Sequence, residues 1–385
     1  NPRWGHAPAK QIVFNGESPD RDSAMPPISR RTALKLFTLS VAALALPATA
    51  QRPSAAATVD RGLFPQSVAS GDPRPDSVVL WTRLDPSAWG RDVVLEVAED
   101  AGFEAVRVER AFQVGAATDG CLKVKVTALE ADRTWHYRFV LAEADGSART
   151  SPAGRTRTAP APGTDRDLRF AVMSCQDFNG RWYNTLLPLL DQELDAILHL
   201  GDFIYETTGD PSFQDADGRR IVFEDASGAI TEGEGAFQIA RSLDNYRQLH
   251  RTYRSDGLWQ QVLAAMPLVA TWDDHEYSND CWQDVATYGN GLRDERDAVR
   301  RRNAEQAYFE YMPVDIEVGA VDADGVQSVD AALLFPRTQL WRELRFGRDT
   351  HLFLTDYRSA RPDHPIPEDA FPGALAFDEA ALREW

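Results

Sequence analysis

Three apolar runs in this chain each end in a short segment rich in acids, with a cysteine, a tyrosine or a histidine among them. The runs are LRFAVM, LDAILHL and MPLVAT, and the segments that follow them are Ser174–Asp177, Gly201–Glu206 and Trp272–Glu276. Short apolar runs of this kind are typical of buried strands. Open α/β folds place their ligands at the carboxyl edge of the sheet, so we expect one site there. Hard oxygens, an imidazole and a thiol suit metal ions bound close together.

Asp202 and Tyr205 lie in a Gly-Asp-x-x-Tyr segment. A carboxylate at a strand end can bridge two cations with its two oxygens, and Gly201 allows the sharp backbone turn that directs Asp202 into the site. A phenolate is a rare ligand that prefers a hard trivalent ion such as Fe³⁺. The alternative is a turn at a strand end with a core tyrosine.

Asp273, Asp274 and His275 follow the third apolar run, and Glu276 comes next. Burying two acids and an imidazole is costly without a counter-charge, which a metal ion would supply. His275 could contact a phosphoryl oxygen or protonate a leaving group. The alternative is a solvated acidic loop, although the apolar strand before it argues against full exposure.

Five further residues carry weaker signals. Cys175 is either a thiolate ligand whose pKa is lowered by cations or a small buried residue. His199 lies inside an apolar run and is predicted to be a packed core histidine. Arg358 follows another predicted strand and could bind phosphate through its guanidinium fork or pair with an acid beside the site. Asn279 and Asp280 could add oxygens to a Ca²⁺ site.

The first 50 residues predict an export signal. We interpret Met25 as the true start, which makes residues 1–24 upstream read-through or the result of a wrongly assigned gene start. Residues 25–50 carry the pair Arg30 and Arg31 before an apolar stretch with a small-residue cleavage pattern. Such twin-arginine signals direct folded proteins to the export machinery, which would be a partner of this chain. We expect a periplasmic, secreted or cell-wall location; an ordinary Sec signal with a chance arginine pair is the alternative.

The rest of the chain divides into two predicted domains at a Pro-rich linker, Thr158–Asp165. Residues 60–158 hold short β-branched runs separated by turn residues, as in an immunoglobulin- or fibronectin-like β-sandwich. Residues 166–385 alternate strands with helical segments. Helices are expected over 182–194, 236–265 and 293–312, a long loop over 207–236, and two or three strands over 332–359.

Charge and cysteine content narrow the classes of function. The formal net charge is −18 over 385 residues. A surface this acidic repels nucleic-acid backbones, so no nucleic acid is expected as a stable partner. The chain has three cysteines, Cys121, Cys175 and Cys281, which leaves at least one thiol unpaired. Cys121 and Cys281 fall in different predicted domains, so two buried thiols are expected rather than a bridge.

Together these segments resemble the metallophosphoesterase superfamily, and most closely the PhoD-type alkaline phosphatases. The resemblance also covers Phe64–Pro73, at the start of the predicted sandwich, and the strand end Thr355–Arg358. It implies an α+β fold in which the β-sandwich precedes an α/β/β/α metallophosphoesterase domain.

The resemblance also implies a metal site with a ferric ion and calcium ions. The implied ligands are Cys175, Asp202, Tyr205 and Asp274, with Asp202 bridging and Asp273 as a further candidate. His275 would lie beside the phosphate, which makes Asp274 and His275 the predicted catalytic pair.

One segment of the family pattern is not found. The family has a Gly-Asp-x-His segment far downstream that gives an Asp and a His to the metals. After Glu276 the histidines are His351 and His364, and neither has a suitable context. We therefore interpret the chain as C-terminally truncated, with an incomplete second sheet and an incomplete ligand set.

The resemblance predicts an exported, monomeric enzyme that hydrolyses small-molecule or lipid phosphate esters at alkaline pH, through a hydroxide activated by metal. Two alternatives stay open. The chain could be a non-catalytic fragment whose sandwich serves as a binding or surface module. Alternatively, its substrates could be phospholipid or nucleotide diesters, as for a phospholipase D-like phosphodiesterase.

Overall fold

The computed structural model describes residues 57–211, 214, 218–232, 237–286 and 295–362. They all belong to one unit, Pro53–Trp385. The predicted export signal and His364 lie outside the described residues. Within the described ranges, no helix is both long and apolar enough to cross a membrane.

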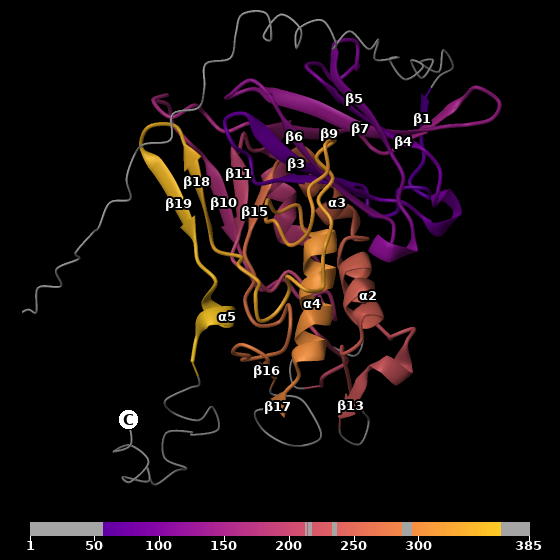
Figure 1. Ribbon diagram of the computed structural model, residues 1–385, viewed down its shortest axis with the longest axis vertical. Helices are drawn as coiled ribbons and strands as arrows, with labels where there is room; N and C mark the ends of the chain where they lie inside the picture. The colour runs from indigo at the N-terminus through magenta and orange to yellow at the C-terminus, as the bar shows by residue number, and fades with distance from the viewer. Residues whose placement is uncertain (1–56, 212–213, 215–217, 233–236, 287–294, 363–385) are drawn as a thin grey trace, which may run out of the picture. The chain divides into compact units, whose positions relative to one another are not determined.

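The first sheet is formed by the N-terminal strands and is mostly antiparallel (Figure 1). Its order is β1-β8-β7-β4-β5, with β9 also paired to β7. Its strands are β1 (Ala57–Val59), β4 (Val93–Ala98), β5 (Val106–Phe112), β7 (Thr134–Ala142), β8 (Ala148–Thr150) and β9 (Gly154–Arg157).

The second sheet joins antiparallel strands of the N-terminal part to parallel strands that come later in the chain. Its order is β10-β11-β15-β2-β3-β6. Its strands are β2 (Val68–Gly71), β3 (Ser77–Arg83), β6 (Cys121–Thr127), β10 (Phe170–Met173), β11 (Ala196–His199) and β15 (Leu268–Ala270). The junction is the parallel pairing of Leu268 with Gly71. A Cβ on Gly71 would lie 2.6 Å from the Leu268 carbonyl oxygen and 2.3 Å from that of Pro313, so the close pairing requires glycine. One sheet therefore runs through both predicted domains.

The two sheets share an apolar core. Alternate residues of each strand point into it, as the two-residue period of a strand requires. Buried members of this core include Leu80, Val124, Val126, Leu95, Val97, Tyr137 and Phe139. The other face of the second sheet is covered as well, since Trp81 Nε1 donates to the Glu310 carbonyl oxygen at 2.8 Å. All seven residues of β3 are buried for this reason.

The helices differ from the sequence prediction in two places. The single helix expected over 236–265 is two, α2 (Leu243–Tyr253) and α3 (Gly257–Ala265). The chain breaks between them because Asp256 caps α3, accepting from the Leu258 and Trp259 amides at 2.9 and 3.3 Å. The segment expected to be helical over 182–194 is a 3₁₀ helix, η3 (Asn184–Asp191), which contains Pro188. Proline removes an amide donor and disfavours a regular α-helix.

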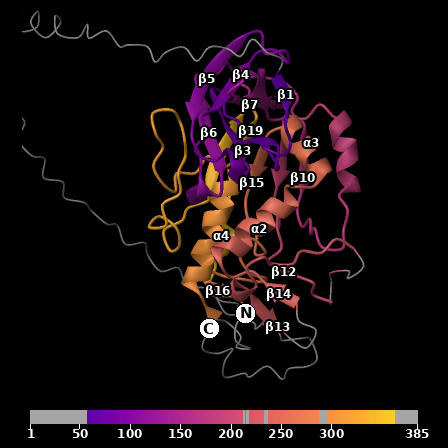
Figure 2. The ribbon, with the colours of Figure 1, turned by 90° about the vertical axis from the view of Figure 1, so that its right-hand side faces the viewer.

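The third long helix, α4 (Ala298–Tyr311), lies within the range predicted for it and packs beside α2, as Figure 2 shows. Its N-terminus begins after Asp297, whose side chain accepts from the Arg300 amide at 2.9 Å.

The segment predicted as a long loop over 207–236 contains regular structure. A small three-stranded sheet has the order β12-β14-β13. Its strands are β12 (Thr207–Thr208), β13 (Ile230–Glu232) and β14 (Phe237–Ile239). The prediction of a loop failed here because the Gly, Asp and Glu content hid Ile221 and Phe223, both of which are buried.

The C-terminal described residues form a hairpin and a short helix. The hairpin pairs β18 (Arg342–Phe346) with β19 (Thr350–Leu354), and α5 (Tyr357–Ala360) follows. Leu344 and Phe346 of the hairpin pack on Ala196 and Val269 of the second sheet. The remaining short elements are η1 (Pro86–Ala88), η2 (Ala116–Thr118), η4 (Ala226–Gly228), β16 (Val285–Ala286) and β17 (Glu295–Arg296). The α/β/β/α arrangement and its incomplete C-terminus stay predictions.

Candidate metal centre

Strands β10, β11 and β15 run parallel and side by side, so their carboxyl ends lie at one edge. Met173 pairs with His199, and His199 pairs with Ala270. The three polar segments begin one or two residues after these positions. The structure therefore brings the segments together where the sequence pattern predicts.

Asp202, Asp274 and His275 form a cluster at this edge. Each offers one possible ligand atom, and these atoms lie within 4.8 Å of one another. Both carboxylates are buried, with 4% of Asp202 and 5% of Asp274 exposed. Cys175 joins them, since its Sγ donates to Asp202 Oδ2 at 3.2 Å. The Tyr205 ring stacks on the His275 imidazole with 4.1 Å between centroids.

The backbone at the strand ends has positive φ at three positions. φ is +58° at Cys175, +111° at Gly201 and +56° at Asp202. Such values are uncommon outside glycine and persist only where the surroundings hold them. Here the two turns hold each other, because the amides of Cys175 and Gln176 donate to the carbonyl oxygens of Gly201 and Asp202 at 3.3 and 3.2 Å. A Cβ on Gly201 would lie 2.3 Å from the Asp273 nitrogen.

Glu276 holds the turn after β11 to the turn after β15. Its carboxylate accepts from the backbone amides of Asp202, Phe203 and Asp273 at 3.0, 2.6 and 2.9 Å. Burial, reinforced by the charge of Asp202, raises the pKa of Glu276 to about 8. The sequence interpretation gave Glu276 no role. The signal for such a role was the position of Glu276 among acids that follow an apolar strand, because a carboxylate buried there requires hydrogen-bond donors.

Glu206 is the second acid without a role in the sequence interpretation, and it orients His275. Its side chain is fully buried, and its Oε2 lies 2.7 Å from His275 Nδ1. Its other oxygen accepts from the Asn279 amide at 2.6 Å. With Nδ1 occupied by Glu206, the Nε2 atom of His275 is the one left for a ligand or substrate.

The electrostatics of the cluster follow from burying several acids beside one imidazole. Burial and the charge of Asp274 raise the pKa of Asp202 to about 6, although His275 opposes this. Burial alone would lower the pKa of His275, but Glu206, Asp274 and Asp202 raise it to about 10. Burial also raises the pKa of the Cys175 thiol and of the Tyr205 phenol. Bound cations would instead lower the pKa values of Asp202, Cys175 and Tyr205, because positive charge stabilises their anionic forms.

Asp273 and Arg358 are turned toward each other. Arg358 Nε donates to Asp273 Oδ1 at 2.7 Å, and its Nη2 lies 3.4 Å from Asp274 Oδ1. Burial opposes the positive charge of Arg358, but Asp273 and Asp274 raise its pKa. The sequence left two roles open for Arg358, phosphate binding and an ion pair with an acid beside the site. The structure shows the ion pair. Asp273 lies outside the three-residue cluster.

The other candidates have structural positions. His199 is buried, and its ring lies 5.2 Å from that of Phe203. The backbone amide of Asp280 donates to Asp274 Oδ2 at 2.5 Å. Cys121 and Cys281 are buried free thiols. His351 lies on the β18–β19 hairpin, with its Nε2 3.1 Å from Glu343.

Tyr253 links the strand-end segment that contains Asp177 to the one that contains Tyr205. Its hydroxyl donates to Asp177 Oδ1 at 2.7 Å and accepts from the Tyr205 amide at 3.1 Å. Asp177 is itself buried and also accepts from the Asn179 amide and from Gln214 Nε2. The backbone that carries Tyr205 is thereby fixed relative to the Cys175 turn.

Comparison with known proteins gives consistent results for both halves of the chain. Residues 170–382 match the profile of a family described as PhoD-like phosphatase, and residues 48–160 match the N-terminal domain of the same family. Alkaline phosphatase D of Bacillus subtilis (strain 168) is 32% identical over 309 residues, which cover 78% of this chain and 47% of the relative. A solved structure described as that of PhoD superposes with a TM-score of 0.64 at 32% identity, covering 78% of this chain and 53% of its own. The chain thus spans about half the length of these relatives.

Proposed function

Because this chain belongs to the PhoD-like phosphatase family, we propose that it is a phosphoric ester hydrolase whose centre is built on Asp202, Asp274 and His275. The observation that carries the proposal is the clustering of their ligand atoms within 4.8 Å at the carboxyl edge of the parallel strands. The family relationship supports the hydrolysis of phosphate esters. The carboxylate cluster supports a site for cations, which would neutralise the charge of a phosphate group.

The donor set fits metal ions. Two buried carboxylates, a thiol and a phenol lie close together, and the ligand atoms of Asp202, Asp274 and His275 are within 4.8 Å of one another. Burial, with a smaller contribution from the charge of Asp274, raises the pKa of Asp202, and a bound cation would offset both effects. We propose Cys175, Asp202, Tyr205 and Asp274 as ligands of a ferric ion, with calcium on carboxylate oxygens of the same cluster. When bound, the cations supply Lewis acidity toward phosphoryl oxygens and lower the pKa of water. Asp273 is left to hold Arg358.

His275 is the proposed proton donor to the leaving group. Glu206 fixes the ring through Nδ1, and Tyr205 stacks on its face, so the imidazole has little freedom to rotate. Arg358 keeps Asp274 in place from the other side. The buried setting strengthens each of these electrostatic contacts relative to water.

The proposed substrates are small-molecule or lipid phosphate esters. We propose that the protein acts as a monomer after export by the twin-arginine route, which the arginine pair at Arg30 and Arg31 supports. The net charge of −18 disfavours nucleic acids as stable partners.

The test is metal analysis combined with a visible spectrum. We expect iron and calcium in the purified protein and a tyrosinate-to-iron charge-transfer band that Tyr205→Phe abolishes. Tyr137→Phe is the matched control, because Tyr137 is buried in the core between the two sheets. Aryl phosphate hydrolysis should fall by about 10²-fold or more in Asp202→Asn, since one charged donor to the centre is lost. Absence of bound metal together with absence of hydrolysis, in this chain and in a C-terminally longer form, would refute the proposal.

A further inference from the structure

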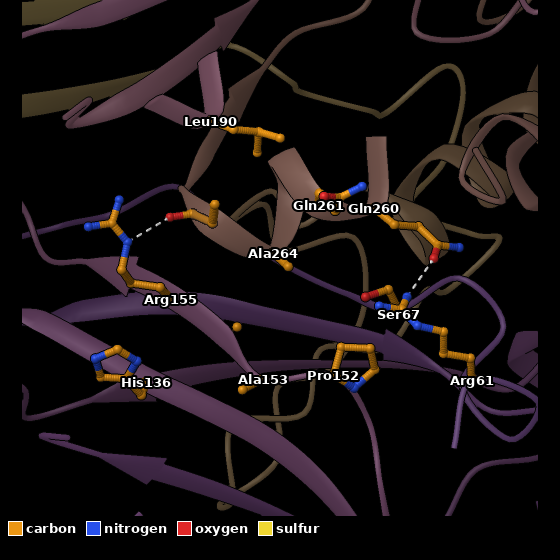
Figure 3. Close-up of a pocket in the computed structure, with 12 residues that line it drawn as sticks. Arg61, Ser67, His136, Pro152, Ala153, Arg155, Leu190, Gln260, Gln261 and Ala264 are labelled. Atoms are coloured by element: carbon orange, nitrogen blue, oxygen red, sulfur yellow. Dashed lines mark hydrogen bonds between the residues drawn. The ribbon is translucent and has the colours of Figure 1, made fainter. Parts of the chain in front are cut away.

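A groove lies between helix α3 and the segment that leads into strand β9 (Figure 3). Its volume is about 450 Å³, a size that accepts a small organic molecule. Pro152 and Ala153 line one side, and Gln261 and Ala264 of α3 line the other, with Leu190 of η3 above them. Elements α3 and η3 lead into the amino ends of β15 and β11. The groove is therefore at the opposite end of these strands from Asp202 and Asp274.

Cationic and polar side chains lie at both ends of the groove. Figure 3 shows Arg155 and His136 at one end and Arg61 at the other. His136 and Arg155 are direct partners across strands β7 and β9. The guanidinium of Arg155 uses Nε to donate to the Ala265 carbonyl oxygen at 3.1 Å. This bond fixes the guanidinium group through Nε and leaves its two Nη atoms for other partners.

The two arginines of the groove lack close carboxylates. The ion-pair partner of Arg155 is Glu193, whose oxygen is 3.9 Å away on a side chain that is 82% exposed. Arg61 donates to Gln260 Oε1 at 3.3 Å and has no ion pair within the described part of the chain. The carboxylate next to it, Asp60, accepts instead from the amides that follow it in the chain.

Several arginines elsewhere in the molecule have short ion pairs. Arg247 with Glu310, Arg301 with Glu305 and Arg342 with Asp72 all have contacts of 2.7 Å. In a chain of net charge −18, two guanidinium groups without such partners on one groove make a local positive region. Concave regions of one sign attract ligands of the opposite sign.

Ser67 adds a second, independent feature of the groove. It belongs to the segment Phe64–Pro73, which the proposed metal centre does not use. The residue is 2% exposed and has φ of +59°, yet it lines the groove. Its hydroxyl forms no hydrogen bond with any described residue, whereas its amide and carbonyl groups are paired. A residue that lines a cavity with positive φ, and whose hydroxyl has no partner in the described structure, can offer that hydroxyl to a ligand.

We propose that this groove binds a small organic oxyanion, a carboxylate or phosphate group on a short apolar chain. Arg155 would pair with the oxyanion, because a guanidinium fork matches two oxygens of either group. His136, at the same end of the groove as Arg155, would add a hydrogen bond to the oxyanion, whereas Ser67 lies beside Arg61 at the other end and would bind a polar group there. The apolar chain would lie against Pro152 and Ala264. The site is distinct from the metal centre and does not depend on the proposed hydrolysis.

Calorimetric titration of the full chain tests the proposal with octanoate and octylphosphonate as probes and 1-octanol as the neutral counterpart. The phosphonate presents the oxygens of a phosphate group on a carbon–phosphorus bond that ester hydrolysis does not cleave. We expect at least one anionic probe to bind about tenfold or more tightly than octanol, because only the anions can pair with the guanidinium. Preference for one anion identifies its head group as the natural one, and equal binding supports the shared chemistry. Equal affinity for octanol, or no binding of either anion at millimolar concentration, would overturn the proposal.

Two variants assign the binding to the groove. Arg155→Gln removes the charge, and Gln261→Glu adds an opposing charge on an exposed position of α3 with little risk to folding. Each should weaken binding of the anion by about tenfold, while ester hydrolysis stays unchanged. Arg337→Gln is the control, since Arg337 is exposed, has no ion pair within the described part of the chain and lies outside the groove. Binding that is unaffected by both groove variants would place the anion elsewhere, for instance on the metal centre, and would refute the site.

Discussion

At the residue scale, the geometry of the metal centre depends on a glycine as much as on the acids. Gly201 has φ of +111° and no room for a side chain, because a Cβ would meet the Asp273 nitrogen at 2.3 Å. Its role is to let the turn that carries Asp202 lie directly against the turn that carries Asp274. The prediction that glycine allows a sharp turn here is consistent with this φ. The close approach of the other turn could not be foreseen, since it depends on which strands are neighbours.

Gly201→Ala should therefore destabilise the protein and disturb the centre. We expect a loss of about 2–5 kcal/mol in the free energy of unfolding, from backbone strain and steric overlap together. Urea denaturation measures it. Gly90→Ala is the matched control, because φ is +75° there and nothing lies within 4 Å of the added Cβ. It should cost only about 1–2 kcal/mol, the cost of the left-handed backbone alone. Equal losses in the two variants would contradict the steric account.

At the element scale, the sequence predicts strands better than helix ends. The three apolar runs before the polar segments are strands β10, β11 and β15. The prediction that they are buried holds for β11 and β15, whose apolar residues suit a sheet with parallel neighbours. It is wrong for β10, which lies at the edge of the sheet and leaves Val172 62% exposed. The helical period over 236–265 continued through Asp256, so the break between α2 and α3 was not visible in the periodicity. The break is set by the cap at Asp256. The sequence did not reveal it, because an acidic residue in a helical pattern can equally lie on the exposed face of one continuous helix.

Asp256→Ala should lower stability by about 1–2 kcal/mol, because the first amides of α3 lose their acceptor. Asp256 also pairs with Arg219, so Asp256→Asn separates the two effects. Asparagine keeps the cap and removes the charge, and it should recover most of the loss if capping dominates. Thermal or urea unfolding of both variants measures the difference. A loss in Asp256→Asn as large as in Asp256→Ala would show that the ion pair with Arg219 matters more.

At the scale of the whole molecule, the sheet that crosses both predicted domains is the main feature the sequence did not reveal. Composition changes sharply at the Pro-rich linker, which is why a boundary is predicted there. The pairing of Leu268 with Gly71 joins residues far apart in the chain, and no local pattern encodes it. The same holds for Glu276 and Glu206, whose roles arise only when separate turns meet. Residue types at strand ends were predictable, while the partners that hold them were not.

The long-range packing also buries two histidines whose ionisation couples the fold to pH. His199 and His250 are 1% and 0% exposed, and neither ring nitrogen of His250 has a hydrogen-bond partner in the described part of the chain. Burial, helped by the charge of Arg254, lowers the pKa of His199 to about 3 and that of His250 well below its usual value. In the unfolded chain both would titrate near the ordinary value of about 6.5. The unfolded state therefore binds more protons below that pH.

The free energy of unfolding should consequently fall as the pH drops below about 6.5, with each imidazole contributing up to about 1.4 kcal/mol per pH unit until its own folded pKa is reached. Urea denaturation between pH 7 and 4.5 measures the slope, which also contains contributions from acids. His250→Phe removes one titrating group and keeps a ring stacked on Tyr311. The slope should be shallower in this variant by up to about 1.4 kcal/mol per pH unit, the contribution of one proton. An unchanged slope would mean that His250 is already protonated in the folded protein. The account of a neutral His250 beside Arg254 would then be wrong.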